Sequence, residues 1–185
     1  MQPALKSDYV SVEDYLAAES ASDVRHEYLG GLVYAMAGET TTHNTICLNL
    51  ASAIRSRLKG GPCKIYMSGI RVNFDLRSDE YFYYPDVLVT CDKRDTHERF
   101  VHNPKLIIEV LSESTERVDK REKFFAYTGI PSLDEYLLVS QVCQEVTIFR
   151  RAQNWKAETI AGVKAKLTLE ALRVTLPLAA IYEGV

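Results

Sequence analysis

One stretch of the chain has apolar residues at steps of three and four positions, which predicts an amphipathic helix over residues 43–58. The positions that share this face are His43, Ile46, Cys47, Leu50, Ile54 and Leu58. Threonines at positions 40–42 can cap its start, and Gly60-Gly61-Pro62 ends it. We expect further helices over residues 11–18, 23–28 and 116–127, the last of them ended by Gly129-Ile130-Pro131.

Short apolar runs bounded by turn residues predict strands between and after these helices. They cover residues 32–37, 64–67, 70–74, 86–91, 106–111, 135–139, 142–150 and 156–160, with shorter pieces at 167–169 and 174–176. The run 106–111 is the most apolar, which is typical of a central strand. The pattern predicts an α/β protein of mixed α+β type, with a central mixed β-sheet flanked by helices and with extra β-strands. Residues 1–8 are expected to form a flexible N-terminal arm, and residues 9–185 a single domain.

Composition limits the classes of protein and the compartment. The 185 residues carry a net charge of −3, which argues against a protein that coats DNA but leaves open an enzyme with a local basic groove. The four cysteines Cys47, Cys63, Cys91 and Cys143 show no metal-type spacing, so we expect buried free thiols in a reducing compartment. No apolar run approaches the roughly 20 residues of a membrane helix, and no signal peptide is recognised. We therefore expect a cytoplasmic protein that does not enter a membrane.

Two predicted strands each carry one carboxylate, and these are the first candidates for chemistry. Asp86 begins one apolar strand, and Glu109 lies inside another, between Ile108 and Val110. A carboxylate in an apolar strand is costly to bury without a partner. That partner can be an arginine or lysine in a structural ion pair, or a divalent metal such as Mg²⁺, which prefers oxygen ligands.

A basic helix follows the second carboxylate. Asp119, Lys123 and Tyr127 are spaced four residues apart, so they share one face of the predicted helix. If this helix packs against the Glu109 strand, Lys123 can stabilise negative charge on a phosphate or orient an attacking water. The alternative is an exposed helix with an ordinary Asp–Lys pair.

The order of these residues resembles the PD-(D/E)XK nuclease superfamily, and more closely the Uma-type family of "putative restriction endonucleases". The resemblance covers roughly residues 9–180. It is carried by the segments 26–33, Tyr84-Pro85-Asp86-Val87 and 108–115, by His43, and by Asp119, Lys123 and Tyr127 before Gly129-Ile130-Pro131 and Glu135-Tyr136. It implies a restriction-endonuclease-like core and an endonuclease that hydrolyses phosphodiester bonds, with DNA as the expected substrate.

The resemblance also implies roles for single residues. Asp86 and Glu109 are expected to hold Mg²⁺ (or Mn²⁺), with the Val110 carbonyl as a further ligand. The superfamily has a lysine two residues after the second acid, but Leu111 stands there, so Lys123 is the candidate replacement. If Lys123 points to solvent instead, the site can bind metal without cutting efficiently.

Two further residues are candidates for the same site. Glu27 resembles the acid on the first core helix of the superfamily, where it would assist with a second metal or a water. A structural ion pair is the alternative for Glu27. His43 is a candidate phosphate contact or base, and otherwise a packing or capping residue.

A different class of function stays open at this point. The missing lysine at position 111 and the negative net charge also fit a nuclease-fold protein that binds nucleic acid or a protein partner without cutting. A homodimer is expected, since two-fold symmetry lets two sites address two strands. The charged loop 92–103 can contact DNA through Lys93, Arg94 and Arg99, or it can be solvated surface.

Overall fold

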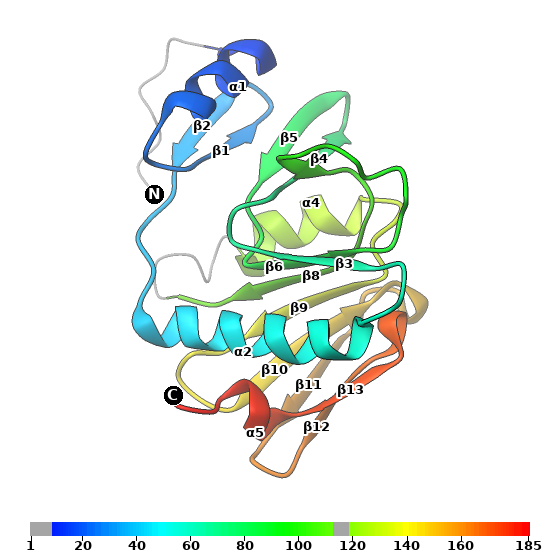
Figure 1. Cartoon of the computed structure of the whole chain (residues 1–185). Helices are drawn as coiled ribbons and strands as arrows, with labels where there is room; N and C mark the ends of the chain where they lie inside the picture. Colours follow the sequence, from blue (N-terminus) through cyan, green and yellow to red (C-terminus); the bar gives the residue numbers. More distant parts are fainter. Residues whose placement is uncertain (1–8, 113–118) are drawn as a thin grey trace.

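The computed structural model describes residues 9–112 and 119–185, and it has the mixed α+β architecture that the sequence predicts. Two larger sheets and one small sheet pack with helices between and around them (Figure 1). The predicted arm at residues 1–8 lies outside the described residues, and the assignment of residues 9–185 to one domain stays a prediction.

The largest sheet is mixed and contains the predicted central strand. Its strands are, in spatial order, β11 (Ala157–Ala161), β10 (Glu145–Arg150), β9 (Glu135–Val139), β8 (Pro104–Val110), β6 (Val87–Thr90) and β3 (Lys64–Met67). Strand β8 pairs parallel with β9, whereas the other pairs of this sheet are antiparallel. The most apolar run of the sequence therefore lies in the middle of the sheet, where both of its faces are covered.

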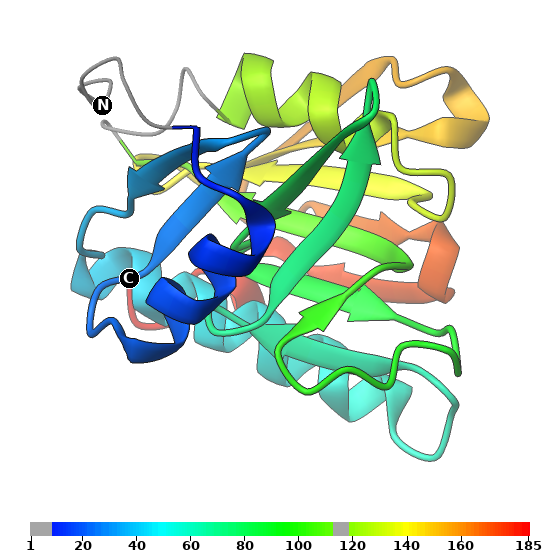
Figure 2. The ribbon, with the colours of Figure 1, turned by 90° about the horizontal axis from the view of Figure 1, so that it is seen from above.

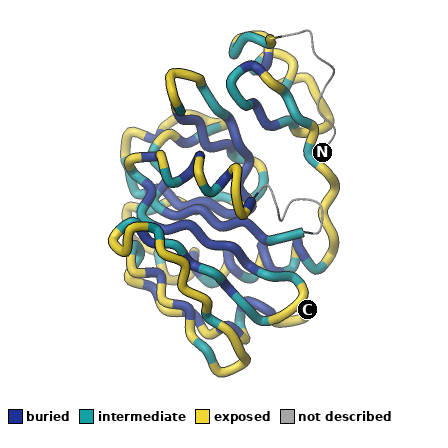
Figure 3. The backbone as a smooth tube through the Cα atoms, turned by 180° about the vertical axis from the view of Figure 1, so that it is seen from behind, coloured by how far each residue is buried: buried dark blue, intermediate teal, exposed yellow. Residues whose placement is uncertain are grey.

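Alternation along the central strands divides the core into two clusters. Leu106, Ile108 and Val110 of β8 face a first cluster, whereas Ile107 faces a second one on the other side of the sheet. The buried strands stand out when the backbone is coloured by burial (Figure 3). Because side chains alternate with a period of two, Glu109 lies on the face of Ile107.

Helix α2 (Thr41–Leu58) covers the first cluster. Its apolar residues Ile46, Cys47, Leu50 and Ile54 are buried, and the Thr40 side chain caps its start by accepting from the His43 N–H. The rest of this layer consists of the small sheet of β12 (Lys166–Leu169) and β13 (Val174–Pro177), helix α5 (Leu178–Ile181) and the short 3-10 turn η3 (Glu170–Leu172). The 3-10 turn η2 (Arg151–Gln153) follows β10, and Arg151 donates to the carbonyls of Ile130 and Leu133.

The opposite face carries a helix and the second large sheet. A π-helical turn η1 (Asp119–Lys123) continues into helix α4 (Phe124–Thr128), which packs on the second cluster. The start of the helix predicted over residues 116–127 lies outside the described residues. The five-stranded sheet has the order β2 (Leu32–Ala35), β1 (His26–Leu29), β5 (Asp79–Tyr83), β4 (Arg71–Leu76) and β7 (Phe100–Val101).

The helix predicted over residues 23–28 is wrong, because this segment ends in strand β1. Gly30 and Gly31 have φ angles of +53° and +96°, which fit a two-residue hairpin turn between β1 and β2. Helix α1 (Val12–Ala21), capped by Ser11 as predicted, lies beside this hairpin (Figure 2), at the end of the molecule that is uppermost in Figure 1. Glu27 is thus on a strand and not on a core helix.

The cysteines also differ from expectation. Cys63 and Cys91 form a disulfide that joins the chain just before β3 to the chain just after β6, and Cys143 is exposed. Only Cys47 is the buried free thiol that the sequence predicts. Among the described residues, no helix has the length and apolar character needed to cross a membrane.

Candidate active site

Asp86 and Glu109 come from neighbouring antiparallel strands. In the pairing of β6 with β8, Val87 lies opposite Ile108. Asp86 lies in the bend directly before Val87, next to the end of β8 that carries Glu109. The backbone N–H of Val110 donates to Asp86 Oδ2 at 2.7 Å, which fixes the Asp86 side chain against the end of β8.

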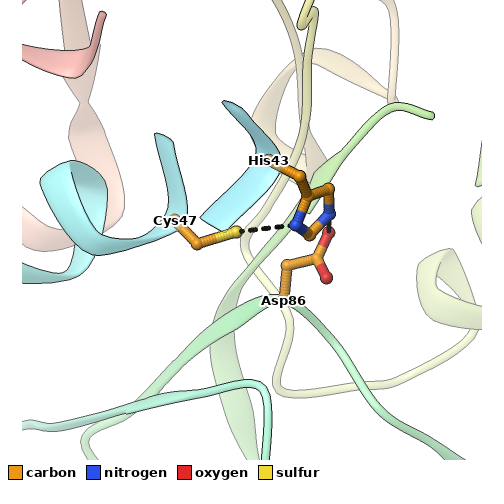
Figure 4. A group of neighbouring side chains, drawn as sticks. All are labelled: His43, Cys47 and Asp86. Atoms are coloured by element: carbon orange, nitrogen blue, oxygen red, sulfur yellow. Dashed lines mark hydrogen bonds and ion pairs between the residues drawn. The ribbon is translucent and has the colours of Figure 1, made fainter. Parts of the chain in front are cut away.

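His43 reaches Asp86 from the start of α2 (Figure 4). Its Nε2 lies 3.1 Å from Asp86 Oδ2, and its Nδ1 lies 3.6 Å from Cys47 Sγ. Burial opposes protonation of His43, but the hydrogen bond and charge of Asp86 outweigh this and raise its pKa. His43 is therefore a hydrogen-bond partner of Asp86, and its backbone N–H is capped by Thr40.

The three side chains in Figure 4 each offer a ligand atom, and these atoms lie within 4.8 Å of one another. Burial and the nearby carboxylates, Asp86 first among them, raise the pKa of the Cys47 thiol. A thiol binds metal as the thiolate, so a proton held on Cys47 disfavours it as a ligand. Asp86 is the member of this group that suits a hard cation.

Lys123 lies inside the protein, with its ammonium among three carboxylates. Its Nζ is 3.1 Å from Glu27 Oε1, 3.2 Å from Glu109 Oε1 and 3.4 Å from Asp119 Oδ1. Tyr127, one turn further along the helix, donates its hydroxyl to Glu109 Oε1 at 2.9 Å. The predicted face of Asp119, Lys123 and Tyr127 is thus turned toward the Glu109 strand. The π-helical turn at its start is a feature that often accompanies functional sites.

Glu27 lies on β1 of the five-stranded sheet, and its carboxylate contacts the Lys123 ammonium. Its position on β1 lets Oε1 accept both from Lys123 and from the backbone N–H of Tyr84, at 3.2 Å. Tyr84 precedes Pro85 and Asp86, so the segment that follows β5 carries one residue that holds Glu27 and another that accepts from the Val110 N–H. The two large sheets therefore meet at this cluster of charges.

The cluster holds more negative charge than its own cation balances. Four buried acids, Glu27, Asp86, Glu109 and Asp119, surround one lysine. Burial raises the pKa of Glu27 and Glu109, and for Glu109 the neighbouring carboxylates raise it further, although Lys123 acts in the opposite direction. Burial alone would lower the pKa of Lys123, but Glu109, Glu27 and Asp119 outweigh it, so the pKa is raised and the amine stays protonated.

Glu27, His43, Asp86, Glu109, Asp119 and Lys123 line one cavity of about 570 Å³, whereas Cys47 and Tyr127 lie outside its lining. Further lining residues that sequence reasoning missed include Tyr34, Glu39, Tyr84 and Gln141. The position of Gln141 could have been found, because it follows β9, the parallel neighbour of β8, and parallel strands end at the same edge of a sheet. Its side-chain amide donates to the carbonyl of Leu111 at 2.8 Å.

Leu111 itself packs against the second core cluster, so it contributes no charge to the cavity. The sequence has no lysine at position 111, and the ammonium of Lys123 contacts Glu109 from the following helix instead. Lys123 is buried and points to Glu109 and not to solvent, which is the orientation that a replacement for the missing lysine requires.

Comparison with known proteins gives the family. A sequence model described as "Putative restriction endonuclease", Uma2, matches residues 12–179. The chain belongs to the Uma2 family. An uncharacterized protein of Synechocystis sp., slr1290, is 33% identical over 187 residues, covering 98% of this chain and 96% of the relative. A second one, sll1609, is 29% identical over 170 residues, covering 89% and 95%.

A solved structure supports the same fold for this Uma2 chain. It is the crystal structure of "a putative nuclease belonging to DUF820" from Anabaena variabilis, with a TM-score of 0.72 over 87% of this chain and 91% of that one. At 19% identity the likeness concerns the fold. The restriction-endonuclease-like fold expected from the sequence is thereby confirmed.

Proposed function

We propose that this protein is a divalent-metal-dependent endonuclease that hydrolyses phosphodiester bonds in DNA. The family and the fold support a nuclease. The observation that carries the proposal is the set of buried acids around Lys123, in a cavity at the edge of the sheet where β8 and β9 end.

The free oxygens of these acids support a metal site. The hydrogen bonds and ion pairs of Asp86 use Oδ2, and those of Glu27 and Glu109 use Oε1. Within residues 9–112 and 119–185, each of the three carboxylates thus keeps a second oxygen for another partner. Hard oxygen donors with an excess of negative charge are what Mg²⁺ or Mn²⁺ requires.

Asp86, Glu109 and the Val110 carbonyl would hold the ion, with Glu27 beside them. When bound there, the ion would supply polarisation of a phosphate oxygen and activation of a water. Its two positive charges would also offset the repulsion that raises the pKa of Glu109.

The chain's own residues supply the remaining chemistry. Because its pKa is raised, Lys123 acts as an ammonium that stabilises charge developing on the phosphate, and not as a base. Tyr127 and Asp119 keep Glu109 and Lys123 in position. His43 fixes Asp86, and its raised pKa favours the protonated form that could also meet a phosphate oxygen.

The alternative is a nuclease-fold protein that binds nucleic acid or a protein partner without cutting. It is favoured by one observation, the contact between Lys123 and Glu109, because a lysine held in a carboxylate cluster can replace a metal as the neutralising charge. In that case the four acids and Lys123 would form a closed structural network.

One experiment separates the two. Plasmid nicking is measured with Mg²⁺, Mn²⁺ or EDTA for the wild type, Asp86→Asn and Glu109→Gln, and binding of the same ions is followed by calorimetry. Metal-dependent nicking that both variants lose supports the endonuclease. Absence of ion binding by the wild type would overturn it, and equal nicking by all three proteins would reveal a contaminant.

We also propose a homodimer, because two copies can address both strands of a duplex. Sedimentation velocity with and without duplex DNA tests this. A species of one chain under both conditions would contradict the proposal.

A further inference from the structure

Arg71 is a buried arginine without a carboxylate partner in the described part of the chain. Its guanidinium donates one long hydrogen bond, from Nη1 to the Tyr15 hydroxyl at 3.4 Å. Its Nε is buried and has no hydrogen-bond partner there. A guanidinium has five N–H donors, and a buried charged group with unused donors is costly. Arg71 therefore has capacity for a partner that the described residues do not provide.

Three aromatic rings hold this guanidinium in place. The Arg71 Cζ atom lies 5.6 Å from the ring centroids of Tyr15, Phe82 and Tyr84. Such rings attract a cation through their faces, but they leave its N–H groups unsatisfied. The arrangement orients the arginine without neutralising it, which is what a site for an incoming anion needs.

Arg71 lines a second cavity, of about 560 Å³, together with Leu16 and the loop 96–100. The loop contributes Arg99 and His97 as basic groups, Phe100 as an aromatic one, and Glu98 as the single acid. The backbone N–H of Arg99 donates to His97 Nδ1 at 3.1 Å, which holds the His97 ring beside Arg99. Phe100 is half-buried, and its ring stacks on the His97 ring at a centroid distance of 3.5 Å. Basic groups beside aromatic rings are typical of sites for nucleic-acid strands.

Tyr84 connects this cavity with the candidate active site, because it lines the first cavity and its ring contacts Arg71, which lines the second. Val72 lies opposite Tyr83 in the pairing of β4 with β5, and the same register places Arg71 opposite Tyr84. Tyr84 contacts the Arg71 guanidinium through its ring and lines the first cavity, where its backbone N–H holds Glu27. A strand whose reacting phosphate lies in the first cavity can thus reach the second one.

We propose that Arg71, with Arg99 and His97, forms a phosphate-binding subsite for a nucleic-acid strand, separate from the acid cluster. The assignment of the strand as substrate rests on the proposed function, whereas the capture of a phosphate group does not. An arginine suits this role because its planar fork matches two phosphate oxygens.

The test is DNA binding in EDTA, so that it does not depend on metal or on cleavage. Fluorescence anisotropy of a labelled oligonucleotide is followed over a range of salt concentrations for the wild type, Arg71→Gln, Arg71→Lys, Arg99→Gln and Arg94→Gln. We expect Arg71→Gln to weaken binding about tenfold and to lower the slope of log affinity against log salt by about one. Arg94 is exposed and paired with Asp92, so Arg94→Gln is the charge-matched control and should bind like the wild type.

The outcomes separate the proposal from its rivals. Equal affinity of the wild type, Arg71→Gln and Arg99→Gln would overturn it, and so would an equal loss in Arg94→Gln, which would show a diffuse charge effect. Arg71→Gln should melt no lower than the wild type, since it removes an unpaired buried charge. If it fails to fold, Arg99→Gln at the rim decides in its place.

Two further arms identify the source of the phosphate and keep this proposal apart from the previous one. Oligonucleotides with and without a 5′-phosphate, and inorganic phosphate alone, distinguish a strand interior from a strand end. If no protein cleaves DNA but the effect of Arg71→Gln persists, the endonuclease fails and the phosphate subsite stands.

Discussion

The ammonium of Lys123 lies 3.2 Å from Oε1 of Glu109, although the two residues belong to a helix and to a central strand. Leu111, on the strand itself, packs into the core. The positive charge beside Glu109 therefore comes from the π-helical turn that carries Lys123 and not from β8. Its position depends on how this turn packs against the strand.

Lys123→Met should therefore damage both stability and activity. Removing one partner of a buried charge network costs about 3 to 5 kcal/mol, and losing a charge that stabilises the transition state costs about 10²- to 10³-fold in rate. Urea denaturation and plasmid nicking measure the two effects. Arg121→Met, an exposed change in the same π-helical turn, is the control and should leave both nearly unchanged. Wild-type nicking by Lys123→Met would exclude its proposed role.

The acids should respond in the opposite way in the absence of metal. Four buried carboxylates surround one lysine, so Glu109→Gln or Glu27→Gln removes excess negative charge. In EDTA we expect either variant to be as stable as the wild type or more stable, while stabilisation by Mg²⁺ is reduced. Thermal melts with EDTA and with saturating Mg²⁺ test this, where ligand at about 100 times its Kd adds roughly 2.7 kcal/mol to the wild type. A large loss of stability in EDTA would show that the acids form a balanced structural network.

Stability should also depend on pH in a direction set by Glu27 and Glu109. Burial raises their pKa in the folded state above the ordinary value of 4.5, so the folded protein binds more protons than the unfolded chain. Their contribution to stability is full below the unfolded pKa and is lost as pH rises through the folded pKa. We expect the metal-free protein to lose stability as pH rises from 4.5, and Mg²⁺ to stabilise it more at pH 8 than at pH 5. The double variant Glu27→Gln/Glu109→Gln should flatten this dependence, and an unchanged profile would contradict the assignment.

The disulfide gives a prediction that is independent of the site. Cys63 and Cys91 are 28 residues apart in sequence, and closing such a loop stabilises a protein by about 3 to 4 kcal/mol in the chain-entropy view. Cys63→Ser/Cys91→Ser should melt lower than the wild type by a corresponding amount, while Cys143→Ser should not. Thiol titration under denaturing conditions should find two reactive cysteines before reduction and four after it. Four thiols in the untreated protein would show that the bond is absent.

Much of the fold could be predicted because local patterns agree with the tertiary structure. The helical spacing from His43 to Leu58 matches α2, since one face of this helix is buried along its length. The apolar run of β8 identifies a strand covered on both faces. Strand β1 was missed because its four residues include His26 and Glu27, and its conformation is set by pairing with β2 and β5 across the Gly30-Gly31 turn. The disulfide leaves no local signal, since it depends on the pairing of β3 with β6.

The site was predictable as a set of residues but not as an arrangement. Glu27, Asp86, Glu109 and Lys123 were all candidates, and the structure brings them to one cavity. What the sequence could not show is that one lysine contacts three acids, or that Tyr84 holds Glu27 through its backbone. Arg71 carries no motif at all. Its proposed role is inferred from its surroundings, which are three aromatic rings and no carboxylate partner within the described residues.

The two large sheets meet at Lys123, and this affects the stage of protein synthesis at which nuclease activity can arise. A nascent chain on the ribosome presents Glu27, Asp86 and Glu109 before Lys123, which follows Glu109 by 14 residues. Strand β9, which borders β8 in the finished sheet, emerges later still. We expect a chain truncated before β9 to have no nuclease activity, so DNA near the site of translation would meet the cutting centre only once folding has joined both sheets.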